Sequence, residues 1–393
     1  VWFDGRVETP LDTFRVREAV ERLQAKGIEA LAICFLHSYA NPDHERVAVE
    51  IVREMAPGIS VCASSDVFPY MREYERWTTT TMNAYVQPVV HRYISRLESE
   101  LSGRGFAGRL HIMTSSGGMV TADIARRFPI RLLESGPAAG ALMSAHHGQA
   151  LGEKNVLSFD MGGTTAKGAL VRDGVPLKKY ELEVARVHEF KAGSGLPAKT
   201  PVIDLIEIGA GGGSLAEIDE RGVIRVGPRS AGAVPGPVCY GAGGETPSLT
   251  DANLVLGLLN ADFFLGGRMA LDVEKAGDAI MTSIAEPLGL DLLRAAWGIH
   301  EVVNEDVAQA FRIHASERAF DYRKASMVGF GLLLAAIGCF SFLNGSVKWL
   351  TQTYDPMMVA WARNIGAFVF MLAVFWPRHR GRLFRPVRPV GQV

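Results

Sequence analysis

The stretch that most limits how this chain can fold is LSFDMGGTTAKGALV, residues 157–171. An apolar run ends at Phe159, a polar turn rich in glycine and threonine follows, and a second apolar run begins at Ala166. Apolar runs on both sides of a Gly-Gly turn predict an antiparallel β-hairpin with a polar tip.

The tip of this hairpin has the composition of a phosphate-binding turn. Gly162 and Gly163 carry no Cβ atom, so a phosphate group can approach the backbone closely. The hydroxyl and amide groups of Thr164 and Thr165 can donate hydrogen bonds to that phosphate. Asp160 is a suitable ligand for a hydrated Mg²⁺ ion. The alternative is an ordinary Gly-Gly hairpin whose polar residues only satisfy the turn.

Other loops of small residues also follow apolar strands, as expected where several loops converge on one nucleotide-binding cleft. The strand at 203–208 ends in GAGGGS, and four glycines in five positions favour close approach to a ligand over a plain flexible turn. A second loop, ESGP, precedes a helix that Pro137 opens. The candidate binding residues in these two loops are Gly209, Gly211, Gly212, Gly213, Ser214 and Gly136.

Glu134 lies at the start of the ESGP loop. Its carboxylate can position a water molecule or a metal ion, or it can cap the N-terminus of the helix that follows. The spacing leaves both alternatives open. We take Asp160 and Glu134 as the candidate catalytic residues, with Asp160 also as the candidate metal ligand.

The composition indicates a folded cytoplasmic protein. The chain has 393 residues, of which 48% are hydrophobic, and this excludes a disordered chain. Four cysteines without a CxxC pair indicate neither a disulfide framework nor a cysteine-built zinc site. The first 324 residues are acidic overall, which argues against nucleic-acid binding. The opening residues show no initiator Met and no signal-peptide pattern, so we expect the chain to begin inside a longer protein.

Apolar periodicity predicts alternating helices and strands. Helices are expected at 11–26, 41–55, 72–102, 252–259, 272–286 and 292–318, and strands at 30–36 and 59–63. Thr250 and Asp251 are expected to cap the helix at 252–259, and Asp251 either only caps it or also faces the site. We expect three regions, at 1–150, 151–325 and 326–393.

The last region differs from the rest in composition. Residues 325–347 carry no charge, and residues 356–377 carry only Arg363. Each run is long enough to cross a bilayer, and the basic cluster RHRGRLFRPVR that follows is typical of a cytoplasmic flank. The tail therefore predicts a two-helix transmembrane hairpin, with a pair of buried soluble helices as the alternative.

Several separated motifs together resemble the hydantoinase A/oxoprolinase family, which includes ATP-binding subunits of acetone and acetophenone carboxylases. They are CFLHSYANPDHE, REYERWTTTTMNAYVQPVV, SSGGM, ESGPAAG, FDMGGTTAK, IDLIEIGAGGGS, VGPRSAGAVPGPVCYG and TDANLVLG. The resemblance covers residues 1 to about 330. It implies an α/β fold of the actin-like ATPase class, as in sugar kinases, with Asp160 to Thr165 holding ATP phosphates.

The resemblance also implies a reaction. It points to Mg²⁺ or Mn²⁺ with ATP, and to phosphorylation of the amide oxygen of a cyclic amide as the activating step. The alternatives are an ATP-dependent ketone carboxylase subunit, which the TTAK turn favours, and an inactive chimeric fragment attached to the membrane. A hydantoinase B-type subunit is the implied partner.

The sequence departs from the family pattern at both ends. No DxGGTxTD turn precedes the first residue, so the ATPase fold is expected to be incomplete. After residue 330 the tail instead resembles the start of a drug/metabolite-type transporter, which favours a rearranged or artefactual junction over an evolved tether.

Overall fold

The structure is a computed structural model that describes residues 1–185 and 193–330. The chain divides into two compact units, Val1–Val328 and Gly329–Val393. The transporter-like sequence, the second predicted membrane span and most of the first fall on residues 331–393 and so lie outside the described residues. Over the described ranges, no helix is both long enough and apolar enough to cross a membrane.

The helices and strands alternate along the first half of the chain, as the periodicity predicts. The helices are α1 (Thr13–Gln24), α2 (Asp43–Met55), α3 (Ser64–Val67), α4 (Glu73–Gly103), α5 (Ala122–Arg127), α6 (Ser135–Ala150), α7 (Leu249–Val255), α8 (Val273–Ile280), α9 (Glu286–Leu288) and α10 (Leu292–Glu317). The strands are β1 (Ala30–Ile33), β2 (Ser60–Ala63), β3 (His111–Met113), β4 (Met119–Thr121), β5 (Val156–Met161), β6 (Ala166–Arg172), β7 (Val175–Pro176), β8 (Lys178–Lys179), β9 (Leu182–Val184), β10 (Leu196–Ala198), β11 (Val202–Ile203), β12 (Leu205–Ile208), β13 (Ser214–Ile218), β14 (Ile224–Ser230) and β15 (Ser326–Phe330).

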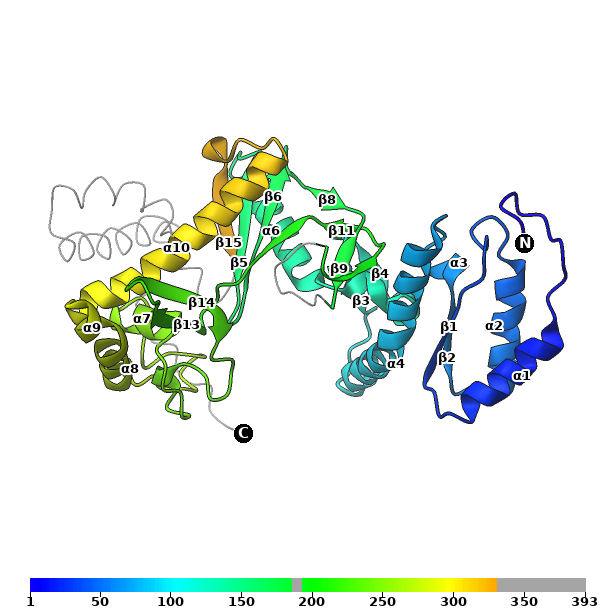
Figure 1. Ribbon diagram of the computed structural model, residues 1–393, viewed down its shortest axis with the longest axis horizontal. Coiled ribbons are helices and arrows are strands. Elements are labelled where there is room, and N and C mark those ends of the chain that lie inside the picture. Colours follow the sequence, from blue (N-terminus) through cyan, green and yellow to red (C-terminus); the bar gives the residue numbers. More distant parts are fainter. Residues whose placement is uncertain (186–192, 331–393) are drawn as a thin grey trace. The chain divides into compact units, whose positions relative to one another are not determined.

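A small parallel sheet organises the first part of the chain. β1 and β2 pair in parallel, with α1 and α2 on one side and α4 on the other (Figure 1). Val20 of α1 and Val49 of α2 share a core with Ile33 of β1, while Cys62 of β2 packs with Ala84 of α4. The predicted helices and strands of this region are therefore confirmed, and α4 continues through Pro88 as one helix.

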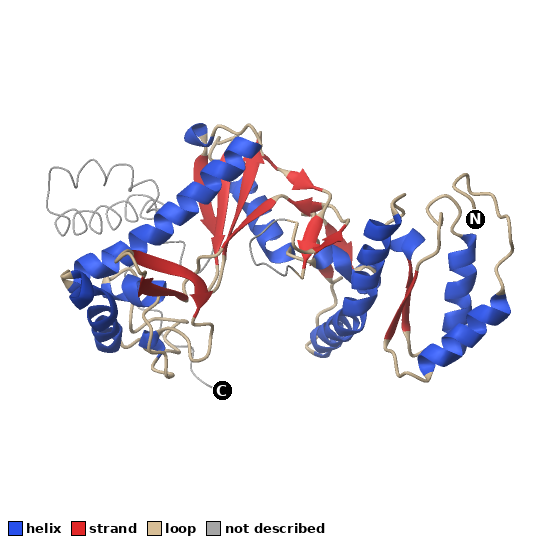
Figure 2. Cartoon of the chain, in the orientation of Figure 1, coloured by secondary structure: helices blue, strands red, loops and turns tan. Residues whose placement is uncertain are grey.

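A five-stranded sheet holds the predicted hairpin. Its strands run in the order β12-β6-β5-β15, and β7 also pairs with β6. α6 covers one face, where Ala138 and Ala141 pack with Ala169. α10 covers the other face (Figure 2). There the rings of Phe311 and Phe159 are 6.1 Å apart. Residues alternate between the faces of a strand, so Asp160, next to Phe159, lies on the α6 face.

The start of the tail is a strand. Residues 326–330, with which the first predicted membrane span begins, form β15 and lie beside β5 at the edge of this sheet. The uncharged run therefore begins as a sheet strand, because its apolar residues pack against α6: Val328 adjoins the core of Ala145, Val156 and Val171.

The last described region combines a strand pair with helices. β13 and β14 pair antiparallel. The helix expected at 252–259 begins earlier, as α7, because Ser248 is the residue that caps it. The helix expected at 272–286 is α8 followed by a π-helical turn, Met281–Ala285, and the short α9.

Candidate functional site

The tip of the β5–β6 hairpin presents unpaired backbone amides. The strands pair from Val156 with Val171 up to Met161 with Ala166, and the Gly162 amide donates to the Thr165 carbonyl at 2.9 Å. Gly162, Gly163 and Thr164 are exposed. Within the part of the chain that is described, the amides of residues 163, 164 and 165 donate a hydrogen bond neither to a backbone carbonyl nor to a side chain. Successive free N–H groups in a tight turn form a concavity that suits phosphate oxygens.

The GAGGGS loop lies buried directly behind this tip. The Gly212 and Gly213 amides donate to the carbonyls of Gly162 and Gly163, at 3.0 and 2.6 Å. A Cβ atom on Gly211 would lie 2.6 Å from the carbonyl carbon of Thr164. The close approach that the glycines permit is therefore an approach to the hairpin backbone.

The amides of this loop are occupied within the chain. The Gly211 amide donates to Ser214 Oγ at 2.8 Å, and the Ser214 amide donates to the Gly211 carbonyl at 3.0 Å. Together with the bonds of Gly212 and Gly213, these bonds give each amide from Gly211 to Ser214 an acceptor within the chain. The loop therefore supports the tip, and its direct contact with a ligand, including contact through Gly209, stays a prediction.

The beginning of α7 supports the loop in turn. The amide and the hydroxyl of Thr250 both donate to the Gly212 carbonyl, at 2.8 and 2.7 Å. Asp251 is fully buried and accepts hydrogen bonds from the amides of Val238, Cys239 and Ser248. The prediction that Asp251 caps the helix is wrong by three residues: it is the third helical residue, which completes a capping box with Ser248, and its carboxylate does not face the site.

Four charged side chains form a cluster beside the tip. Asp160, Lys167 and Glu207 lie side by side on β5, β6 and β12, since Lys167 is in register with both neighbours. Lys167 Nζ lies 2.7 Å from Glu134 Oε1 and 3.1 Å from Glu207 Oε1. The cluster brings both candidate catalytic residues, Asp160 and Glu134, to one place.

Burial shifts the proton affinities of this cluster. Burial raises the pKa of Asp160, and the charge of Lys167 opposes that rise without cancelling it. Burial alone would lower the pKa of Lys167, but the hydrogen bonds and negative charges of Glu134 and Glu207 raise it above its ordinary value. Lys167 is therefore firmly protonated, and Asp160 holds its proton more strongly than an exposed aspartate does.

Glu134 has an unusual backbone. It precedes α6 with φ +60° and ψ 24°, a left-handed conformation that is uncommon for a residue with a side chain. Glu134 is the N-cap residue of α6, as one alternative predicts, but its carboxylate makes no capping hydrogen bond and pairs with Lys167. Gly136, in the first turn of α6, is exposed, and a Cβ there would meet no atom within 4 Å. The amides of Ser135 and Gly136 are thus close to the cluster and have no partner within the helix, while Pro137 has no amide hydrogen and the Ala138 amide donates to the Glu134 carbonyl at 3.2 Å.

The donor set can be tested against a divalent cation. The described residues contain no group of three or more His, Cys, Asp or Glu side chains placed to hold a metal ion. Mg²⁺ commonly takes one or two carboxylates from a protein and its remaining oxygens from water and phosphate. Asp160 lies at the base of the candidate phosphate-binding tip and fits that pattern, so the residues suit a metal that would arrive with a nucleotide.

Lys167 and Glu207 were not among the predicted site residues. A signal for Lys167 was present, because closing a hairpin around Gly162–Thr165 pairs position 160 with position 167. No comparable signal marked Glu207, since its place depends on the pairing of β12 with β6.

Comparison with known proteins gives consistent matches. Residues 76–333 match the model of the hydantoinase/oxoprolinase family, and residues 1–56 match its N-terminal region. An uncharacterised protein from Methanocaldococcus jannaschii is 42% identical over 331 residues, covering 84% of this chain and 48% of the relative. The caprolactamase subunit alpha from Pseudomonas jessenii is 38% identical, covering 84% and 46%. The acetone carboxylase beta subunit from Xanthobacter autotrophicus is 32% identical, covering 95% and 51%.

A solved structure agrees with these matches. The crystal structure of the ATP-dependent caprolactamase from Pseudomonas jessenii superposes with a TM-score of 0.69 at 37% identity, covering 84% of this chain and 47% of that one. The chain spans about half the length of the curated relatives it matches. These matches support an α/β ATPase-like fold and give no support to the transporter-like interpretation of the tail. The chain belongs to the hydantoinase/oxoprolinase family.

Proposed function

We propose that this chain is the nucleotide-binding part of an ATP-dependent enzyme that hydrolyses cyclic amides. The observation that carries the proposal is the hairpin tip, where three unpaired amides stand next to the half-buried carboxylate of Asp160. Phosphate oxygens need donors and a counter-cation, and the tip supplies the donors while Asp160 supplies a ligand for the cation.

Positioning is the main task of these residues. In this proposal the amides of Gly163, Thr164 and Thr165 hold the terminal phosphates, and Asp160 orients Mg²⁺ or Mn²⁺ beside them. The bound cation would supply charge neutralisation as the phosphoryl group moves. Fixed donors of this kind stabilise developing charge without reorganising, which is the usual source of rate in phosphoryl transfer.

The acceptor in this proposal is the oxygen of a cyclic amide. Phosphorylation by ATP, with release of ADP, makes the amide carbon electrophilic, so water can add to it. Expulsion of the protonated ring nitrogen then breaks the C–N bond and leaves an acyl phosphate, which a second water hydrolyses to the carboxylate and phosphate. Glu134 is the candidate to orient the first water, because its carboxylate lies in the same charged cluster as Asp160. The likeness to the caprolactamase subunit alpha supports a cyclic amide as the acceptor.

A ketone carboxylase is the second candidate, favoured by the 32% identity with the acetone carboxylase beta subunit over 95% of this chain. The higher identity with the caprolactamase subunit alpha, 38%, favours the cyclic amide over this candidate.

The complete reaction is expected to need more protein than this chain. The relatives are named as subunits, and this chain matches about half of each. We therefore propose a hydantoinase B-type companion subunit as the partner.

The test is an assay of the chain with Mg·ATP and a panel of lactams, with and without a B-type companion subunit. Release of phosphate that depends on a lactam, together with loss of that lactam, is the expected result. Phosphate release that depends on acetone and bicarbonate, with no lactam consumed, would transfer the assignment to the carboxylase. Asp160→Ala serves as the control and should abolish either activity.

A further inference from the structure

A loop of small residues follows β14 and has no role in the proposed function. It is SAGAVPG, residues 230–236, and it belongs to the motif VGPRSAGAVPGPVCYG. Residues 232–235 are exposed, and Val234 is 86% exposed. The chain after the loop is held firmly, because the buried carboxylate of Asp251 accepts the amides of Val238 and Cys239. The loop therefore has a fixed base and an exposed crown.

Gly213 connects this loop to the hairpin tip. Its amide donates to the Gly163 carbonyl at 2.6 Å, and its own carbonyl accepts the amide of Ala231 at 2.8 Å. A Cβ atom on Gly213 would lie 2.9 Å from Ser230 Oγ and 3.0 Å from the carbonyl oxygen of Gly163. The hydroxyl of Ser230 is therefore beside the backbone of the hairpin tip.

The end of the β13–β14 pair fixes the position of Ser230. Ser230 is the last residue of β14, and its partner in the register is Ser214, where the glycine loop ends. The register of the two strands shifts between Ser214 and Ala216. Shifts of this kind redirect side chains and are common next to active sites. Ser230 is thus placed by the same loop that supports the tip.

The hydroxyl of Ser230 keeps its own hydrogen available. Its oxygen accepts the Gly232 amide at 3.2 Å. A serine hydroxyl has one hydrogen to donate besides the lone pairs that accept. Among the described residues, the Ser230 O–H group donates to no acceptor. Ser230 is half-buried, so one further donor is available beside the three unpaired amides of the tip.

We propose that the hydroxyl of Ser230 donates a hydrogen bond to a phosphate oxygen of the nucleotide at the hairpin tip. The proposal rests on the proposed function, since it concerns the same phosphate site. Hydrogen bonds to an ionised acceptor are stronger than those between neutral groups, so Ser230 adds affinity to that of the tip amides. The alternative is that Ser230 only holds the turn through its bond with Gly232.

The test is calorimetric titration of two ligands, Mg·ATP and Mg·tripolyphosphate, into the whole chain and its Ser230→Ala variant. Tripolyphosphate has no nucleoside, so it reports on phosphate contacts alone. Both affinities should fall by about five- to tenfold in the variant, because one hydrogen bond to an anion is lost. Ser230→Thr should stay within about threefold of the original chain, since it keeps the hydroxyl.

Thermal unfolding without ligand separates the two roles of the hydroxyl. Gly232 is exposed, so water can replace the acceptor that its amide loses. Ser230→Ala should therefore shift the unfolding temperature of the ligand-free chain by less than about 2 °C. Ser316→Ala is the matched control, because Ser316 is an exposed serine whose hydroxyl donates to the Arg312 carbonyl at 2.7 Å on α10. It should leave both affinities unchanged.

The possible failures are distinguishable. Equal binding of Mg·ATP by the original chain and by Ser230→Ala would overturn the role of Ser230 and leave the proposed function standing. Weaker binding of Mg·ATP with unchanged binding of Mg·tripolyphosphate would also overturn it, as would a loss of affinity that accompanies a larger fall in the unfolding temperature. An original chain that binds neither ligand would overturn both proposals together.

Discussion

At the scale of single residues, the glycines around the hairpin have two different tasks. Gly211 is buried and lets its loop contact the hairpin, where a Cβ would be 2.6 to 2.8 Å from three backbone atoms of Thr164 and Thr165. Gly163 is exposed at the tip, and a Cβ there would meet no protein atom within 4 Å. Packing requires the first glycine, whereas only a ligand would require the second.

Alanine substitutions at these two positions should therefore affect different properties, stability at Gly211 and nucleotide binding at Gly163. Gly211→Ala should lower the free energy of unfolding by about 1–3 kcal/mol, because the backbone atoms of Thr164 and Thr165 cannot move away from the added Cβ as a flexible side chain could. Gly163→Ala should change it by less than about 0.5 kcal/mol while weakening Mg·ATP binding. Denaturant unfolding and calorimetry measure the two effects. Equal losses of stability in both variants would contradict this division of tasks.

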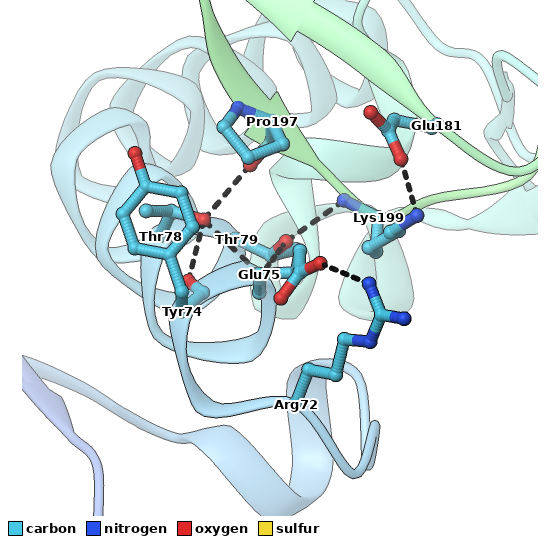
Figure 3. Close-up of polar contacts among 8 residues, drawn as sticks. All are labelled: Arg72, Tyr74, Glu75, Thr78, Thr79, Glu181, Pro197 and Lys199. Atoms are coloured by element: carbon cyan, nitrogen blue, oxygen red, sulfur yellow. Dashed lines mark hydrogen bonds and ion pairs between the residues drawn. The ribbon is translucent and has the colours of Figure 1, made fainter.

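At the scale of elements, the threonines of α4 attach this helix to the strands that follow the hairpin. Thr78 Oγ1 donates to the carbonyl of Pro197 at 2.8 Å, and Thr79 Oγ1 accepts from the amide of Lys199 at 2.8 Å (Figure 3). In the same view, the Lys199 side chain contacts Glu181, and Arg72 contacts Glu75 at 3.4 Å. The threonine run thus joins α4 to β10, which is more than a hundred residues away in the sequence.

Thr79→Val should destabilise the chain by about 1–3 kcal/mol, because the shape is kept while the Lys199 amide loses its acceptor. Thr81→Val is the matched control: Thr81 is exposed on the same helix, so its change should stay within about 0.5 kcal/mol. Denaturant unfolding of both variants gives the comparison. A Thr79→Val chain as stable as the control would show that the bond between α4 and β10 contributes nothing.

The attachment of α10 to the sheet predicts a dependence on pH. Burial alone would raise the pKa of Asp204, but its hydrogen bond with Arg318 and the charge of Lys179 hold that pKa below its ordinary value. The resulting stabilisation is present above the unfolded pKa of about 3.9 and is lost as the pH falls through the lower folded value.

Asp204→Asn should therefore lower the free energy of unfolding at pH 7 by about 1–3 kcal/mol, because it removes the carboxylate that pairs with both Arg318 and Lys179, while Glu317 still pairs with Arg318. The difference from the original chain should shrink as the pH falls below about 4. Urea unfolding at several pH values measures it, with the exposed Asp262→Asn as the control. A difference that stays constant down to the lowest pH would contradict the assigned pKa shift.

At the scale of the whole molecule, the features predicted from the sequence are those set by nearby residues. The hairpin of β5 and β6 follows from two apolar runs and a Gly-Gly turn. The helices α1, α2 and α10 follow from apolar periodicity, and Asp12 and Asp291 are the N-cap residues of α1 and α10. The features that were missed depend on distant partners. The Lys167–Glu134 pair joins residues 33 positions apart. The sequence predicts that the glycine loop and the hairpin converge, but not that the amides of the loop donate to the hairpin carbonyls.

The misplaced cap of α7 has the same origin. Thr250 and Asp251 are good capping residues by type, so local pattern favours them. The structure uses Ser248, because Thr250 is bonded to the glycine loop and Asp251 accepts amides from the segment 238–239. Both residues are engaged by tertiary contacts that local sequence does not report.

Nucleotide binding at the hairpin tip is the central requirement of the proposed function. The decisive measurement is calorimetric titration of Mg·ATP into the whole chain and into its Asp160→Ala variant, with thermal unfolding to show that both are folded. We predict saturable binding by the original chain and a loss of at least about tenfold in affinity for the variant, since the cation loses its protein ligand. Equal binding by the two chains, or no heat from the original chain at millimolar ATP, would contradict the assignment of the tip as the phosphate site.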